Sequence, residues 1–480
     1  MKEEKYEIES IIIDDLFDEF NYKIVFNNEI NIITSPNGFG KSTILRMMYN
    51  FSSGNYHSFF SEVFSELTFI IKEITVDNVN LQDGINSVIN FPGYKIIQIK
   101  KLNDIITITD ISDSKNKSVI IDYVSNSDDI ERFLSNVESF HPYLDRVGYN
   151  RWVNEYTGEL YDKEKVIQLC GDSPDLKKGI PNIEWLDFIS NNLRSYYITT
   201  DRIRISDYSD YKKNSGIARL RARGKPINKT MINVLADDVR IKIQEGIQNQ
   251  FERGRQRESS FPKRLIKGLK EQQKTITVDD VIGAIRDIQI YEDKFTSLGI
   301  LSENSERTTE QLNDFFSYSD SESGAGLTVL KVYLDDIKLK LKTLDSLSTL
   351  LHIFKNSVNK LLSFKEICID TKHGFIVKTK KTNKRNNKEI ELSGLSSGEQ
   401  HLIVMLGKLI FNSSKGDVVL IDEPEISFHP EWQEIFIDII EEIRRLKDFK
   451  VVMATHSPIL IGGRWNNVVE LAEQHRHGEV

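Results

Sequence analysis

The stretch that most constrains this fold is residues 30–43, which read INIITSPNGFGKST. An apolar run at 30–34 gives way to a short loop with two glycines, and a helical pattern begins directly after the loop. A strand, a glycine-containing loop and a helix in this order form a phosphate cradle, because loop N–H groups and the positive helix end converge on an anion. The predicted nucleotide-binding residues are Ser35, Pro36, Asn37, Gly38, Phe39, Gly40, Lys41, Ser42 and Thr43.

Two side chains of this loop have specific predicted roles. Lys41 is expected to reach the β- and γ-phosphates of ATP, and the Ser42 hydroxyl is expected to ligate Mg²⁺. Ser35 stands where the eight-residue pattern has its first glycine. Serine is compatible with that position if its φ is negative, because only a positive φ demands glycine.

Composition narrows the class of protein. A chain of 480 residues, 39% hydrophobic and 28% charged, is long enough for two or more domains. Its net charge of −9 argues against a surface coated with cations for non-specific DNA binding, but leaves room for a local basic groove. The two cysteines lie far apart in sequence, and the N-terminus has no apolar leader. With no long apolar run, we expect a cytoplasmic protein without membrane contact.

The chain order predicts a mixed α/β domain interrupted by a helical one. Strands are expected at 6–13, 22–26, 30–34, 67–76, 94–108 and 195–200, with an irregular insertion at about 119–193. The aromatic residues of that insertion are expected to pack rather than to stack on bases. We therefore predict residues 1–204 as the N-terminal part of the α/β domain, 205–364 as the helical insert and 365–480 as the C-terminal part.

The helical insert carries an apolar stripe. Between 330 and 361, apolar residues recur at threes and fours with one irregular step, which predicts one long coiled-coil-like helix after a flexible joint at 316–326. Basic clusters at 219–225 and 253–264 favour a solvated helix face over a nucleic-acid groove. A hairpin is expected at 367–380 and 389–392. Its tip, Lys380–Lys388, carries five cations. These cations could bind nucleic acid or an acidic protein, or they could simply be solvated.

Two more segments complete the predicted site. The apolar run 418–421 suits a strand buried on both faces, and Asp422 and Glu423 follow at its carboxyl end, where open α/β sheets bind ligands. Asp422 is expected to hold Mg²⁺ through water, and Glu423 to polarise the attacking water. A further apolar run, 451–454, ends before His456, which is expected to contact the γ-phosphate.

The motifs SPNGFGKST, LSSGEQ, VVLIDEP and ATHSP, in this order, resemble the ABC-type P-loop ATPase heads of RecF, SMC and OLD-like proteins. The resemblance implies that a signature helix faces the phosphates of a second copy, and hence a head-to-head homodimer. The signature residues acting in trans are Ser396, Ser397, Gly398, Glu399 and Gln400. By resemblance, Asp201 stands where the family has a glutamine and would hold a metal-bound water, and residues 425–430 form a loop that contacts the partner copy.

Two further segments, YYITTDRI at 196–203 and SFPKRL at 260–265, extend the resemblance to the ATPase subunits of bacterial antiphage systems, most of all to the AriA family of the PARIS system, with the PtuA family of Septu a near neighbour. No Toprim segment, Arg-x4-His motif or zinc-ligand cluster is recognisable, so we expect no nuclease activity in this chain. The resemblance implies a higher oligomer, a separately encoded nuclease effector and a phage-derived trigger. The alternative is a DNA-repair or chromosome-maintenance ATPase that acts directly on DNA.

Overall fold

The chain forms two compact units, Met1–Asn228 with Asn412–Val480 (unit 1) and Lys229–Phe411 (unit 2). The computed structural model describes residues 5–26, 29–74, 92–112, 116–122, 127–140, 144–148, 150–154, 160–163, 166–167, 183–199, 230–270, 276–301, 324–380, 388–426 and 428–477. No helix in those ranges is both long and apolar enough to cross a bilayer.

Unit 1 contains a five-stranded sheet in the order β11-β15-β16-β3-β17, in which all neighbours are parallel. Every residue of β3 and β15 is buried, which explains why these strands read as continuous apolar runs. Thr34 pairs with Thr455, and Asp422 with Ala454, so the carboxyl ends of three strands lie side by side. The strands are β3 (Ile30–Thr34), β11 (Ser195–Ile198), β15 (Val418–Asp422), β16 (Lys450–Thr455) and β17 (Val468–Glu470).

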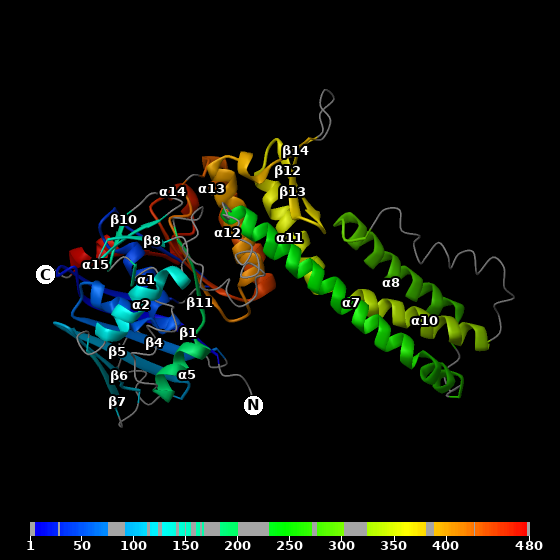
Figure 1. The fold of residues 1–480 in the computed structure, drawn as a ribbon, viewed down its shortest axis with the longest axis horizontal. Helices are drawn as coiled ribbons and strands as arrows, with labels where there is room; N and C mark the ends of the chain where they lie inside the picture. The colour runs from blue at the N-terminus through cyan, green and yellow to red at the C-terminus, as the bar shows by residue number, and fades with distance from the viewer. Residues whose placement is uncertain are drawn as a thin grey trace. The chain divides into compact units, whose positions relative to one another are not determined.

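A second sheet of unit 1 is antiparallel, in the order β2-β1-β4-β5-β6-β7. The predicted strand at 94–108 is in fact two strands, because Asn103 adopts a left-handed φ of 53° and reverses the chain. Figure 1 shows β5, β6 and β7 side by side in this sheet. The strands are β1 (Tyr6–Leu16), β2 (Phe20–Val25), β4 (Glu66–Glu73), β5 (Tyr94–Leu102), β6 (Ile105–Asp110) and β7 (Lys117–Asp122).

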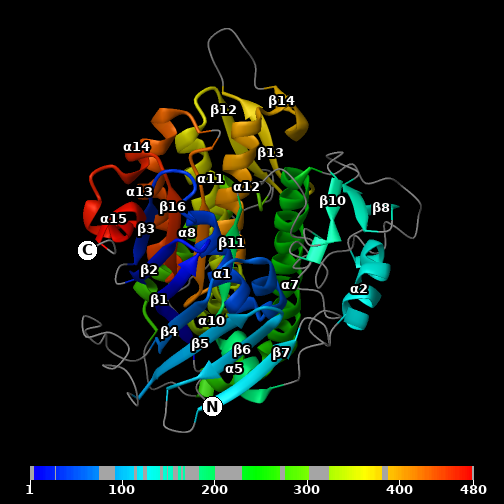
Figure 2. The same ribbon diagram turned by 90° about the vertical axis from the view of Figure 1, so that its left-hand side faces the viewer.

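Helix α1 (Lys41–Ser53) joins the two sheets of unit 1 into one core. Its apolar residues share a buried cluster with residues from both sheets, and the ring of Phe51 stacks on that of Phe69 from β4 with 3.9 Å between centroids. Figure 2 shows α1 among the strands of the two sheets. Since nine of its thirteen residues are buried, contacts with both sheets fix the helix behind the loop at 35–40.

The remaining elements of unit 1 surround these sheets. A small sheet in the order β10-β9-β8 packs with α2 on the buried ring of Trp152 within the predicted insertion. Trp185 packs against the main core, so these aromatic side chains contribute to packing as expected, and Tyr156 lies outside the described residues. The elements are η1 (Tyr56–Ser61), α2 (Ser127–Phe140), β8 (Leu144–Gly148), β9 (Arg151–Asn154), β10 (Leu160–Asp162), α5 (Glu184–Asn192), α13 (Pro430–Lys447), α14 (Pro458–Ile461), η6 (Trp465–Asn467) and α15 (Leu471–His477).

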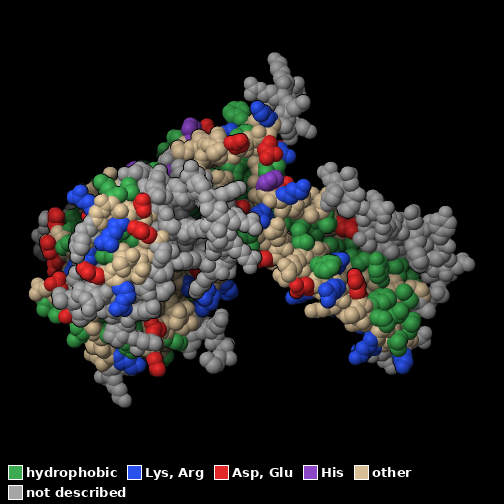
Figure 3. All heavy atoms as spheres, in the orientation of Figure 1, with side chains coloured by type: hydrophobic (Ala, Val, Ile, Leu, Met, Phe, Trp, Pro, Cys, Tyr) green, Lys and Arg blue, Asp and Glu red, His purple; other side chains and the backbone are tan. Residues whose placement is uncertain are grey.

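Unit 2 is largely helical. Helix α10 packs against both α7 and α8, and the buried residues of α8 and α10 form one apolar cluster. Figure 1 shows these three helices lying side by side. On the surface of α8 and α10, Ile290 and Tyr333 are 65% and 44% exposed, and Figure 3 shows hydrophobic side chains over these two helices. The helices are α7 (Met231–Lys270), α8 (Val278–Ser297), α10 (Gly324–Lys342) and α11 (Asp345–Leu361).

The prediction of one long helix through 330–361 is wrong. The chain breaks at Thr343 and Leu344, where both N–H groups bond to carbonyls three residues back, at 3.4 and 3.0 Å. This tighter turn falls beside the irregular step of the apolar stripe, and it keeps Leu344 fully buried in the cluster of α8 and α10. The predicted joint at 316–326 lies outside the described residues up to position 323.

The basic residues of the insert are mainly solvent-facing. Arg264 on α7 forms a paired contact with Asp336 on α10, with 2.6 Å from Nη2 to Oδ2. Arg253, Arg255 and Lys263 are exposed on α7. The cluster at 219–225 lies outside the described residues.

A three-stranded sheet, β12-β13-β14, also belongs to unit 2. The predicted strand at 367–380 is two strands, because the Asp370 carboxylate accepts bonds from the N–H groups of Lys372 and His373 and caps a tight turn. The second hairpin, β13 to β14, matches the expected one. Most of its basic tip, residues 381–387, lies outside the described residues. The elements are β12 (Lys365–Asp370), β13 (Gly374–Thr379), β14 (Glu389–Ile390), η5 (Leu392–Gly394) and α12 (Ser397–Asn412).

Candidate nucleotide site

The loop between β3 and α1 has the backbone of a phosphate cradle. Gly38 and Gly40 adopt φ values of 96° and 86°, a region that side chains disfavour, and α1 begins directly afterwards at Lys41. Ser35 is absent from the positive-φ positions among the described residues, so a serine is tolerated where the pattern has glycine. The Lys41 ammonium is buried and donates to the carbonyl oxygens of Ser35 and Pro36 at 2.9 and 3.4 Å.

The hairpin of β1 and β2 supports this loop from one side. The Tyr22 hydroxyl donates to the carbonyl of Phe39 at 3.0 Å, and the rings of Phe20 and Phe39 lie 5.3 Å apart. A Cβ added at Gly40 would lie only 2.7 Å from Cδ2 of Leu16. The positive φ of Gly40 therefore favours glycine, and any larger residue would also have to displace the end of the Leu16 side chain.

Ser42 and Asp422 form the oxygen-rich part of the site. The Ser42 hydroxyl donates to Oδ1 of Asp422 at 2.9 Å, and the hydroxyl of Tyr197 on β11 donates to Oδ2 at 3.2 Å. Hydroxyl and carboxylate oxygens are the ligands that Mg²⁺ prefers, so these donors fit a magnesium ion. Tyr197 was missed by the sequence analysis, although the alternation of the strand at 195–198 placed its side chain on one face of the sheet.

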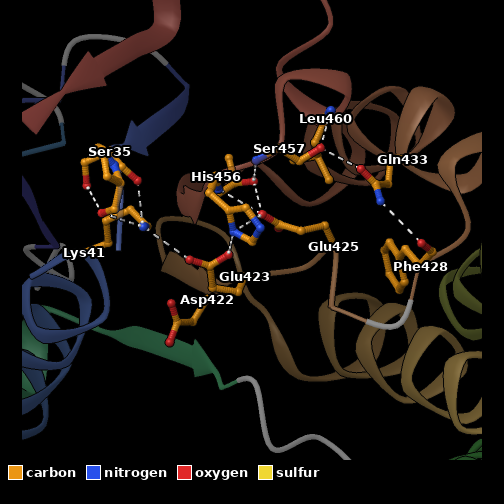
Figure 4. A network of polar contacts seen from close by, with 12 residues as sticks. Ser35, Lys41, Asp422, Glu423, Glu425, Phe428, Gln433, His456, Ser457 and Leu460 are labelled. Carbon is orange, nitrogen blue, oxygen red and sulfur yellow. Dashed lines mark hydrogen bonds and ion pairs between the residues drawn. The ribbon is translucent and has the colours of Figure 1, made fainter. Parts of the chain in front are cut away.

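Glu423 lies between the loop and the end of β16. Its φ of 42° is left-handed, and its N–H bonds to the carbonyl of Ala454 at 2.9 Å, so the chain turns sharply after β15. Oε1 of Glu423 is 3.5 Å from the Lys41 ammonium, and Oε2 is 2.5 Å from Nδ1 of His456 (Figure 4). Burial raises the pKa of Glu423, the Glu425 carboxylate raises it further, and His456 and Lys41 act in the opposite direction.

A second carboxylate, Glu425, reaches the same histidine. Its side chain is 6% exposed, and Oε1 lies 3.1 Å from Nδ1 of His456. Within the described ranges, Glu423, Glu425 and His456 also form a group whose potential metal-ligating atoms lie within 4.8 Å of one another. Glu425 was predicted to lie in a partner-contact loop, whereas its side chain points into the site (Figure 4).

The predicted signature segment belongs to unit 2, where it opens α12. Ser396 and Glu399 form the expected capping box, with Ser396 N–H to Glu399 Oε2 at 2.8 Å and Glu399 N–H to Ser396 Oγ at 3.3 Å. Burial would raise the pKa of Glu399, but bonds from Lys365 and Ser396 outweigh it and lower the pKa. Gln400 Nε2 donates to the carbonyl of Leu395 at 2.9 Å. Asp201 lies outside the described residues.

The parallel sheet, the glycine-bearing loop after β3 and the acidic residues at the end of β15 together define a P-loop ATPase of the ABC type with a helical insertion. Residues 30–462 match the family described as "AAA domain, putative AbiEii toxin, Type IV TA system". The chain belongs to this family.

Individual relatives are more distant. A curated relative, the "Retron Vc95 probable ATPase" of Vibrio cholerae serotype O1 biovar El Tor, is 30% identical over 88 residues, which are 16% of this chain and 17% of that protein. The match therefore spans about a sixth of that relative's length.

Among solved structures, the chain is similar to an Smc head domain with an extended coiled coil from Pyrococcus furiosus, bound to the C-terminal domain of ScpA. The identity is 12%, the TM-score is 0.36, and 99% of each chain is covered. An Smc head domain with a coiled coil and joint from Pyrococcus yayanosii gives 13% identity and a TM-score of 0.31, covering 99% of this chain and 100% of that one. The fold assignment rests on the sheet order and loop geometry, not on these distant likenesses.

Proposed function

We propose that this protein binds and hydrolyses ATP with Mg²⁺ as the ATPase subunit of an antiphage defence system. One observation carries the proposal: three groups of side chains lie together at one edge of the sheet. They are the cation Lys41, the oxygen ligands Ser42 and Asp422, and the pair of Glu423 with His456. Family membership supports ATPase activity.

Each group has a role in binding the nucleotide. Ser42 would hold Mg²⁺ directly and Asp422 through water, and the ion would offset negative charge on the phosphates. Lys41 now donates to loop carbonyls and lies near Glu423, and it turns to the β- and γ-phosphates when the nucleotide binds. By the family resemblance, Asp201 would hold a metal-bound water.

Glu423 is the proposed base for hydrolysis. Burial raises the pKa of Glu423, and a carboxylate with a raised pKa accepts a proton more readily than an exposed one. The contact between Glu423 and Nδ1 of His456 fixes the imidazole, so that its other nitrogen is available to the γ-phosphate. Departure of Lys41 to the phosphates would release Glu423 for this task.

One chain supplies one cradle and one signature helix, so we infer that two copies complete a site. The N-terminus of α12, which Ser396 and Glu399 cap, presents the positive end of the helix dipole and suits an anion. Ser396, Ser397, Gly398, Glu399 and Gln400 of one copy would face the phosphates held by Lys41 of the other. Such head-to-head pairs would assemble into a higher oligomer in the cytoplasm.

The cellular role is proposed from the family and from the retron relative. The family description names a toxin of a type IV system, and the curated relative is named as a retron ATPase. A separately encoded nuclease would be held by the oligomer and released on sensing a phage-derived trigger, as in the AriA family of the PARIS system. The basic tip Lys380–Lys388 is the proposed contact for an acidic protein or nucleic acid.

A second candidate is an ATPase that acts on DNA directly, as in repair or chromosome maintenance. The exposed cations Arg253, Arg255 and Lys263 on α7 favour it, because phosphate contacts need unburied positive charge. This candidate predicts hydrolysis stimulated by DNA and DNA binding that weakens steeply with salt.

The experiment that tests the role is purification of the tagged protein with the product of its neighbouring gene, followed by mass measurement and ATPase assay. The defence role predicts a complex that contains a nuclease and several copies of this chain, and growth arrest only with a trigger. A lone protein whose hydrolysis rises with DNA would support the second candidate. The absence of ATP turnover under both conditions would contradict both.

A further inference from the structure

We propose that Glu425 is a positioning residue for ATP hydrolysis, which holds His456 in the orientation that Glu423 and the γ-phosphate require. This inference rests on the ATP hydrolysis proposed above. It assigns a task to the second carboxylate of the Glu423-Pro424-Glu425 turn, a buried acidic group that the nucleotide contacts do not use.

The contacts of Glu425 converge on the end of strand β16. Oε1 accepts the Thr455 hydroxyl at 2.5 Å and the main-chain N–H of His456 at 2.9 Å. Thr455 Oγ1 in turn accepts the N–H of Ser457 at 3.0 Å. One carboxylate oxygen therefore fixes both the backbone and the side chain of the two residues that end the strand.

The same oxygen lies beside the imidazole ring. Nδ1 of His456 is 2.5 Å from Glu423 and 3.1 Å from Glu425, so two carboxylates face one ring nitrogen. Ionised carboxylates only accept hydrogen bonds, so with both in that form Nδ1 carries the proton, which fixes both the tautomer and the direction of Nε2. The His456 side chain is 53% exposed, so packing alone does not hold it.

The other oxygen, Oε2 of Glu425, is buried and has no hydrogen-bond partner within the described part of the chain. An unpaired buried carboxylate oxygen is costly, so a residue with only a structural task would be better served by an uncharged side chain. The carboxylate is therefore destabilising at this position, which fits a task at His456 rather than in the packing of the turn.

Further hydrogen bonds connect the end of strand β16 to helix α13. The Ser457 hydroxyl lies 2.6 Å from Oε1 of Gln433, and Gln433 Nε2 donates to the carbonyl of Phe428 at 3.3 Å (Figure 4). The strand end that Glu425 fixes is therefore anchored on both sides, by the acidic turn and by α13. A shift of His456 on losing Glu425 would be confined to the ring and its own peptide.

The test compares Glu425→Ala, Glu425→Gln and the matched control Glu431→Ala, an exposed glutamate at the start of α13. Glu425→Ala is expected to lower kcat about 30-fold or more with KM for ATP within about twofold, because a misplaced group loses rate rather than nucleotide affinity. Glu425→Gln keeps an acceptor oxygen and should restore most of kcat, and Glu431→Ala should behave as wild type.

A double-mutant cycle with His456→Ala tests whether Glu425 acts through the histidine. Glu425→Ala should lower kcat less than about twofold when His456 is already alanine. If Glu425→Ala does not fold, Thr455→Val removes one donor to Glu425 and should lower kcat only when His456 is present. The inference would be overturned if Glu425→Ala left kcat unchanged or raised KM by the same factor as it lowered kcat. Additive effects of Glu425→Ala and His456→Ala in the cycle would also overturn it. Wild-type protein without ATP turnover would instead contradict the proposed function itself.

Discussion

The hydroxyl of Ser42 donates a 2.9 Å hydrogen bond to Oδ1 of Asp422, although 380 residues separate the two in the chain. The contact exists because β16 lies between β3 and β15 in a parallel sheet, so that the loop after β3 and the acidic end of β15 share one edge. The whole of unit 2 is inserted between these two parts of the sequence. The contact itself therefore joins two residues of unit 1.

Lys41→Ala should abolish tight ATP binding. The ammonium is the cation of the loop, and without it the phosphates keep only N–H contacts and the helix end. We expect affinity for ATP to fall about 100-fold or more by titration calorimetry. Lys415→Ala, at an exposed lysine paired with Asp448, is the matched control and should bind as wild type. Retained tight binding by Lys41→Ala would remove the loop from the nucleotide site.

Glu423→Gln should bind ATP but hydrolyse it about 10²–10⁴-fold more slowly, because an amide cannot accept the proton of the attacking water. Nucleotide should then hold the protein as an ATP-bound dimer in size-exclusion chromatography. Glu434→Gln, at an exposed position of α13, provides the control. Turnover at the wild-type rate would exclude Glu423 as the base.

Gly374→Ala should destabilise unit 2 by about 3 kcal/mol or more. The φ of Gly374 is 79°, and an added Cβ would overlap the carbonyl of Ala236 and lie 2.8 Å from the N atom of Arg240. The matched control is Gly283→Ala in α8, where a Cβ would meet nothing within 4 Å. There the change should stabilise the helix by about 0.5–1 kcal/mol, because glycine loses more backbone entropy. Denaturant melts of both variants check the contrast, and equal midpoints would contradict it.

Asp238 on α7 should make the fold less stable as the pH rises. Burial raises its pKa to about 6 from the model-compound value of 3.8, so the folded state binds the proton more tightly than the unfolded one. Stability from this group is present below the unfolded pKa and is lost between about pH 4 and pH 6, on the order of 3 kcal/mol. Asp238→Asn should therefore raise the melting temperature more at pH 8 than at pH 4.5. A gain that is equal at the two pH values would show that the carboxylate is ionised in the fold at both.

Much of the candidate site was predictable because buried parallel strands have a plain sequence signal. The runs before Ser35, Asp422 and His456 are apolar without alternation, and strands of that kind end at a common edge. The places of Glu425 and Tyr197 in the site were not predicted, for two different reasons. The turn that aims Glu425 inward depends on the left-handed φ of Glu423, and Tyr197 lies before the end of its strand.

The fold was harder to predict where local geometry overrides periodicity. The apolar stripe through 330–361 continues across the break at Leu344, because a tighter turn keeps that leucine facing the same cluster. Likewise, the turns at Asn103 and Asp370 lie within segments that read as continuous strands. The alternation of apolar and polar residues alone therefore did not reveal them. One-dimensional patterns locate buried faces well, and they locate chain reversals poorly.

The most direct test of the account mixes two inactive variants, Lys41→Ala and Ser396→Arg, and measures ATP turnover. A mixed dimer would carry one site with both an intact Lys41 and an intact Ser396, donated by different copies. The account predicts that each variant is inactive alone and that an equal mixture recovers up to about a quarter of the wild-type rate. A mixture that stays inactive, although co-purification shows that mixed dimers form, would contradict a nucleotide site shared between two copies.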